Sequence, residues 1–110
     1  MAAQKSDVLQ GTLDLLILKA LLAEPLHGWA ISKRIQLMSR EALTATQGSL
    51  YPALYRLEDR GWIAGTEAQS GEGRRIKVYR LTTLGRKQLA EQIESWRAFA
   101  AAMNHVITAG

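Results

Sequence analysis

The C-terminal part of this sequence carries a regular apolar pattern that constrains the fold more than any other feature. Apolar side chains recur there at alternating intervals of four and three residues: Leu89, Ile93, Trp96, Ala100, Met103 and Ile107. An average spacing of about 3.5 residues is typical of a helix that packs along a partner helix. Running from a cap at Thr82 or Thr83 to about Ile107, the helix would be about 37 Å long. A chain of 110 residues is too small to cover it alone, so we expect a second subunit against its far half.

The first predicted helix, from Leu9 to Ala23, is apolar on nearly all sides. One stripe follows helical spacing, and further leucines lie off that stripe: Leu13, Leu16, Ile17, Ala20 and Leu21, then Leu15, Leu18 and Leu22. A helix of this kind is buried on more than one side. We expect one side to face the core and another to meet the second subunit, and we assign Leu13 and Ile17 to this dimer contact.

Two shorter helices are predicted in the middle of the chain, from Trp29 to Arg40 and from about Gly48 to Arg60. Proline is tolerated in the first turn of a helix, where its missing N–H is not needed. Pro52 therefore places the start of the second helix near Gly48 or Ser49. Its cap is expected to be Ser49 or Thr46.

Strands are predicted on both sides of that helix. The β-branched threonines between Leu43 and Gln47 favour a short strand there. Gly61 is well placed to end the helix, and two longer strands follow, Trp62 to Ala68 and Arg75 to Leu81. The Gly-rich segment Gln69 to Arg74 between them predicts a long hairpin turn that projects as a wing.

The order helix, helix, short strand, helix, hairpin, long helix is that of a winged helix-turn-helix. We therefore predict a mainly α fold with a small β-hairpin (α+β). Residues 1–82 would form the DNA-binding part and residues 83–110 the C-terminal dimerisation helix, packed together as one structural domain. The sequence has no internal repeat and no low-complexity linker.

The third helix carries the side chains expected to contact DNA, because proteins of this kind read DNA with the second helix of the motif. Its side chains off the core stripe are suited to phosphates, base edges and thymine methyl groups. The candidates are Ser49, Tyr51, Pro52, Tyr55 and Arg56. The alternative is that the two tyrosines only complete the edge of the core.

The wing is the second candidate DNA contact. Arg74, Arg75 and Lys77 lie in or beside the predicted turn, where Glu72 is the single acid. A basic hairpin beside a recognition helix can hold phosphates or enter the minor groove. Charges also keep edge strands from aggregating, but the preceding helix favours DNA contact. For Lys77 the alternative is that strand alternation turns its side chain sideways.

Composition limits the classes of function that remain possible. The net charge of +4 agrees with an anionic partner, and without cysteine there is no disulfide or thiolate chemistry. The N-terminal residues carry no signal-peptide pattern, so we expect a cytoplasmic protein. His27 and His105 stand alone, His27 as a cap or packing group at a turn, so we expect no enzyme, no metal and no cofactor.

The sequence resembles the PadR family of bacterial regulators from Gly11 to about Val106. The motifs that carry the resemblance are Gly11–Leu15, Leu26–Ile31, Gly48–Glu58, Arg60–Ile63, Arg74–Thr82 and Gly85. It implies a winged-helix repressor that dimerises through its first and last helices and binds palindromic operators. Tyr51 matches a tyrosine that the family uses at DNA, and Arg74 with Arg75 matches its wing. The family often has tyrosine where Trp29 stands.

The resemblance also implies a candidate effector site. Some compact members hold flat hydrophobic ligands at the dimer centre, beside a tryptophan that Trp96 matches. Phenolic acids or drug-like aromatics would be candidates, although Trp96 is equally suited to the dimer contact alone. A winged helix used only for protein–protein contact is the alternative function. It would keep the core pattern but would not need the basic wing.

Overall fold

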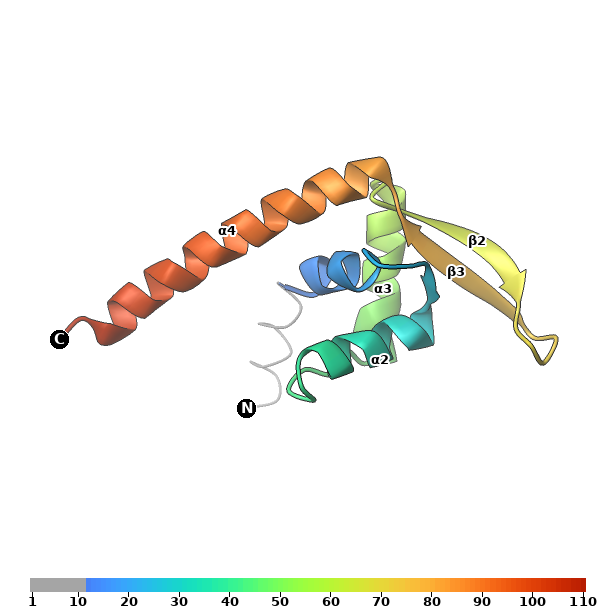
Figure 1. Ribbon diagram of the computed structural model, residues 1–110, viewed down its shortest axis with the longest axis horizontal. Coiled ribbons are helices and arrows are strands. Elements are labelled where there is room, and N and C mark those ends of the chain that lie inside the picture. Colours follow the sequence, from blue (N-terminus) through green and yellow to red (C-terminus); the bar gives the residue numbers. More distant parts are fainter. Residues whose placement is uncertain (1–11) are drawn as a thin grey trace.

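A computed structural model describes residues 12–110 of the chain (Figure 1). The described part of the first helix covers residues 12–20. The elements that follow are β1 (Leu26–His27), α2 (Gly28–Met38), α3 (Gln47–Asp59), β2 (Ile63–Gln69), β3 (Arg75–Leu81) and α4 (Thr83–Thr108). This order confirms the predicted α+β class. Leu9 to Gly11, where the first helix was expected to begin, lie outside the described residues.

The sheet has three antiparallel strands, with β3 between β1 and β2. The predicted hairpin is β2 and β3, whose register runs from Ile63 opposite Leu81 to Gln69 opposite Arg75. Gln69 therefore belongs to the strand, and residues 70–74 form the turn. In Figure 1 the hairpin extends away from the helices, as expected of a wing.

The prediction of a strand from Leu43 to Gln47 is wrong. Residues 43–46 have no regular secondary structure, and Gln47 already belongs to α3. The threonines there do favour extended backbone, but no neighbouring strand is available, and the Ala45 carbonyl instead accepts a 2.9 Å hydrogen bond from the Ser32 hydroxyl. The third strand is β1, where Leu26 lies opposite Tyr79.

Helix α3 begins and ends at residues that are typical of helix termini. Thr46 is the N-cap, and its hydroxyl oxygen accepts from the Ser49 N–H at 3.3 Å, so the threonine is the right choice of the two predicted caps. At the other end Gly61 has φ +79°, a left-handed conformation that glycine adopts without steric cost. The Trp62 N–H then donates back to the Leu57 carbonyl at 3.0 Å, which closes the last turn.

The position predicted for Pro52 is wrong, because α3 begins at Gln47 and Pro52 lies in its second turn. Proline there cannot donate to the Gly48 carbonyl four residues earlier. The helix continues because its inner face is fixed by packing, since Leu50, Leu54 and Leu57 are almost fully buried. Burial of three leucines outweighs one absent hydrogen bond.

The core lies where the first helix, α2 and α3 meet the sheet. Its buried apolar side chains include Leu13, Ile17, Leu18, Ile31, Leu50, Leu54, Leu57 and Ile63. Leu13 and Ile17 are completely buried within this one chain, so the assignment of these two side chains to a dimer contact is corrected. The half-buried leucines of the described part of this helix are Leu15 and Leu16.

Within residues 12–110, helix α4 packs on the body through its first turns and then extends away from it (Figure 1). Thr82 is its N-cap and accepts from the Gly85 N–H at 2.9 Å, as predicted. The same hydroxyl donates to the Gly61 carbonyl at 2.7 Å, which ties the start of α4 to the end of α3. Leu89 is buried, but all residues from 101 onward are exposed.

Candidate nucleic-acid interface

The outward face of α3 is exposed although it carries two aromatic rings and a proline. Tyr55 is 64% exposed and Tyr51 37%, and Pro52 is exposed beside them. These three positions lie opposite the buried leucines of the same helix. Gln47 and Gly48, which sequence reasoning did not single out, are exposed in its first turn. Predicted Ser49 is half-buried at the edge of this face.

Tyr51 lies beside the start of α2. A Cβ atom at Gly28, the first residue of α2, would come within 2.7 Å of the Tyr51 hydroxyl oxygen. A larger residue at this position would require the Tyr51 ring to shift, so the position of the ring depends on Gly28. The nearby helix start is also fixed, because the His27 Nδ1 atom accepts from the Ala30 N–H at 3.4 Å, which confirms the capping role predicted for that histidine.

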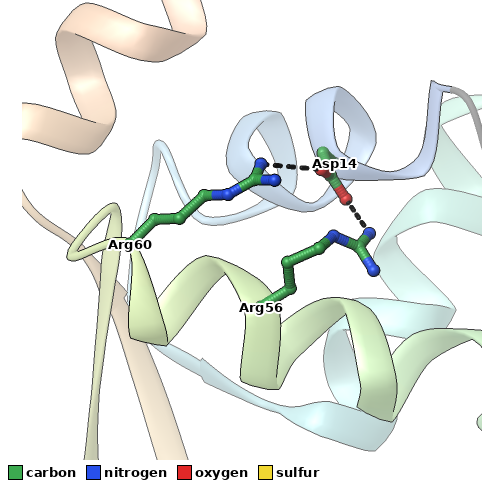
Figure 2. A network of polar contacts seen from close by, with 3 residues as sticks. All are labelled: Asp14, Arg56 and Arg60. Atoms are coloured by element: carbon green, nitrogen blue, oxygen red, sulfur yellow. Dashed lines mark hydrogen bonds and ion pairs between the residues drawn. The ribbon is translucent and has the colours of Figure 1, made fainter.

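Arg56 points away from the outward face of α3 and toward the first helix (Figure 2). Its Nη2 atom lies 2.6 Å from Oδ1 of Asp14, and Nη1 of Arg60 lies 3.8 Å from the other carboxylate oxygen. The side chain predicted to contact DNA is therefore engaged inside the chain. Asp14 is the residue that sequence reasoning missed here, since even its nearer partner, Arg56, is 42 residues distant.

Lys77 is also held inside the chain. Its Nζ atom lies 2.9 Å from Oε1 of Glu58 in α3, and the hydrogen bond to this carboxylate raises the pKa of Lys77 above its ordinary value of 10.5. The other oxygen of Glu58 accepts from the Gly65 N–H in β2 at 3.2 Å. Glu58 thus joins the recognition helix to both strands of the wing, a role for which the sequence offered no signal.

The wing tip keeps its other cations at the surface. The Ser70 hydroxyl oxygen accepts from the backbone N–H groups of Glu72 and Arg74, which fixes the turn. Arg75 forms an ion pair with Glu67, yet its side chain is 80% exposed. Within residues 12–110, the Arg74 side chain makes no ion pair. The predicted cationic residues therefore divide into two groups. Arg74 and Arg75 are exposed at the wing tip, whereas Arg56 and Lys77 each form an ion pair with a half-buried acid on a neighbouring element.

The arrangement defines the class of the protein. Helices α2 and α3 form a helix-turn-helix pair, and the hairpin β2–β3 follows as a wing, which together make a winged-helix protein. None of the helices within residues 12–110 combines the length and the hydropathy that a membrane span requires.

Comparison with known proteins supplies the family. Residues 17–91 match the model of the transcriptional regulator PadR-like family. Because this match covers more than half of the chain, the chain belongs to the PadR-like family of transcriptional regulators. The family and the structural neighbours are regulators rather than enzymes.

Individual relatives agree over nearly the whole length. A transcriptional regulator from Clostridium thermocellum has a TM-score of 0.81 at 31% identity, covering 89% of this chain and 95% of that one. A PadR family regulator from Eggerthella lenta has a TM-score of 0.83 at 26% identity, covering 99% and 93%. An uncharacterized protein of Lysinibacillus sphaericus is 30% identical over 84% of both chains.

Proposed function

We propose that this chain is a repressor that binds operator DNA as a homodimer, with α3 in the major groove and the wing tip on the phosphate backbone. The observation that carries the proposal is the exposed face of α3. The side chains there, Tyr51, Pro52 and Tyr55, are exposed to water. Grouped apolar side chains are seldom exposed on a monomeric protein unless a partner binds them. Helix N-termini favour phosphates, and these side chains suit phosphates and thymine methyl groups.

Charge supports the same partner. Arg74 and Arg75 extend from the wing tip, where both side chains are exposed. Cations of this kind displace the counterions of DNA, so binding should weaken steeply as salt is raised. Since bacterial DNA lies in the cytoplasm, the proposal also places the chain there.

The homodimer is supported by the far half of α4. Its exposed apolar side chains recur along one face of the helix: Trp96, Phe99, Met103, Val106 and Ile107. Trp96, Met103 and Ile107 belong to the predicted series of three- and four-residue steps, and Phe99 and Val106 flank it. The helix that carries them stands away from the body in Figure 1. Pairing of two such helices would bury this face and set the two α3 helices about one DNA turn, about 34 Å, apart.

An aromatic effector is the finer part of the proposal. Trp96 and Phe99 present two neighbouring rings whose centroids are 6.0 Å apart with planes tilted by 41°. A flat hydrophobic or phenolic ligand at the dimer centre would contact these rings. Such a ligand releases DNA only if it binds more tightly to the dimer geometry that cannot bind DNA. Quenching of tryptophan fluorescence by a phenolic acid tests this, and the quenching should be lost in Trp96→Phe.

The deciding experiment measures binding to the DNA upstream of the chain's own gene, with random DNA as competitor and at two salt concentrations. Selective, salt-sensitive binding is expected. Tyr55→Ala should reduce the selectivity, whereas Leu37→Ala removes an equally exposed apolar side chain from α2 and should not. If the folded protein binds neither DNA at low salt, the chain is instead a winged helix for protein–protein contact.

A further inference from the structure

We infer that Asp14 is a positioning residue that fixes the recognition helix α3 through Arg56 and Arg60, so that Arg56 acts on DNA binding through Asp14 and makes no phosphate contact itself. The inference rests on the proposed DNA binding. It names residues that decide how α3 is presented, rather than residues that touch DNA. Figure 2 shows the two arginines converging on one carboxylate from α3.

The geometry uses both oxygens of Asp14. Oδ1 lies 2.6 Å from Arg56 and Oδ2 lies 3.8 Å from Arg60. The two arginines are four residues apart and therefore lie one above the other on the same flank of α3. A single carboxylate thus holds two successive turns of the recognition helix.

The carboxylate is itself firmly placed. Its side chain is only 20% exposed, and it lies on the first helix beside Leu13, which is completely buried. An ion pair removed partly from water is screened less by salt than a pair on the open surface. The contact also links segments far apart in the chain, so it fixes tertiary geometry and adds nothing to the local helix.

Rotation of α3 about its axis is the freedom that this contact removes. Glu58 ties the opposite flank of α3 to the wing through Lys77 and Gly65. With Asp14 on one flank and the wing on the other, the outward face that carries Tyr55 has a defined direction. Without Asp14, α3 would be held by its packed leucines and by the wing side alone, and the same face would be presented less uniformly to base edges.

Positioning and phosphate contact give different signatures. A phosphate contact supports binding to every sequence, and its loss lowers the salt dependence by about one counterion. A positioning group leaves the number of phosphate contacts unchanged. Its loss should therefore reduce the preference for one sequence and leave the salt dependence as it was.

The test uses the full chain and two duplexes of equal length. One is the duplex that the wild-type protein selects from a random-sequence library, and the other is its shuffled sequence. The variants are Asp14→Asn, Arg56→Gln, their combination and the conservative Asp14→Glu. Arg74→Gln serves as the phosphate-contact reference, and Arg86→Gln removes one exposed cation at the start of α4 as the charge control.

We expect Asp14→Asn and Arg56→Gln each to lose preference for the selected duplex by about tenfold, with the salt slope unchanged. The double variant should lose no more preference for the selected duplex than the more strongly affected single variant, because both substitutions remove the same contact. Asp14→Glu should retain most of the preference. Thermal unfolding shows whether each variant is folded. If Asp14→Asn is destabilised, the comparison of Asp14→Glu with Arg56→Gln is used in its place.

Two results would overturn the inference, and they differ from failure of the proposed function. If Asp14→Asn binds both duplexes more tightly while Arg56→Gln lowers the salt slope by about one, Arg56 contacts phosphate. If the two losses add in the double variant, the residues act separately. A folded wild-type protein that selects no duplex and shows no salt dependence refutes DNA binding itself.

Discussion

Internal pairing decides what each cationic side chain can do. Arg56 and Lys77 lie within 3 Å of carboxylates on neighbouring elements, so moving either to a phosphate would take the nearest cation away from a half-buried acid. Arg75 has a partner too, but that pair is open to water and worth little. Arg74 has no acidic partner within the described part of the chain, so its charge is fully available.

The two wing-tip arginines should therefore differ in their contribution to DNA binding. Arg74→Gln is expected to weaken binding to all sequences and to lower the salt slope by about one. Arg75→Gln should have a smaller effect, because Arg75 must first give up Glu67. Affinities at a series of salt concentrations measure both slopes. If both variants have the same salt slope as the wild type, the wing does not contact DNA.

Tyr79 predicts a loss of stability in alkaline solution. It is almost fully buried in the central strand, and burial raises the pKa of its phenol above the ordinary value of 10.0. The unfolded chain then loses this proton first, so the stabilisation is complete below about pH 10 and declines as pH rises through the folded pKa. The raised pKa of Lys77, due to Glu58, acts in the same direction above its ordinary value of 10.5.

Denaturant unfolding from neutral pH to about pH 11 measures this decline. Tyr79→Phe removes the titrating phenol but keeps the ring, so its stability should decline less steeply than that of the wild type. Parallel pH curves for the wild type and Tyr79→Phe would show that Tyr79 does not titrate differently on folding.

Among the elements, the junction of α3, β2 and α4 has the least space. A Cβ atom at Gly85 would lie 2.0 Å from the Trp62 carbonyl oxygen. Thr82 caps α4 and bonds the Gly61 and Trp62 carbonyls at the same place. The direction in which α4 leaves the body is thus set by the turn that ends the recognition helix.

Substitution of two helical glycines should therefore have opposite effects. Gly85→Ala is expected to lower the free energy of unfolding by about 1–3 kcal/mol, because the start of α4 must shift from Trp62. Gly48→Ala, at an open position in the first turn of α3, should raise it by up to about 1 kcal/mol because alanine favours helix. Chemical denaturation measures both, and a Gly85→Ala protein as stable as the wild type contradicts the tight junction.

At the scale of the whole molecule, the shape indicates a missing neighbour. The chain extends 59 Å along its longest axis, chiefly because α4 projects beyond the body (Figure 1). A helix end with Val106 and Ile107 more than two-thirds exposed has apolar surface with no counterpart in the described part of the chain. The proposed homodimer would provide that counterpart by symmetry.

Two adjacent alanines in α4 give a matched test of the dimer. Ala100 lies on the apolar face with Trp96 and Met103, whereas Ala101 lies about 100° further round the helix. Ala100→Glu should shift the protein toward monomers, because it places a charge in the paired face, and Ala101→Glu should not. Sedimentation over a range of protein concentrations measures this. Equal dimerisation of both variants would place the interface elsewhere.

Local sequence patterns predicted the helices, the hairpin and their order, because apolar periodicity and the glycine and threonine stops act locally. The wing, the cap at Thr82, the end at Gly61 and the exposed tyrosines of α3 were all predictable in this way. So was the membership in the PadR-like family, since its motifs keep their order and spacing along the chain. The domain division at residue 82 and the DNA contacts stay predictions.

Which side chains remain available for function depends on the tertiary structure. It buried Leu13 and Ile17 in the core, placed Pro52 in the second turn of α3 and gave the third strand to β1. It also joined Arg56 to Asp14 and Lys77 to Glu58. The physical reason is the same in each case. Burial and ion pairing depend on residues distant in sequence, and a local pattern cannot show which distant partner a side chain will meet.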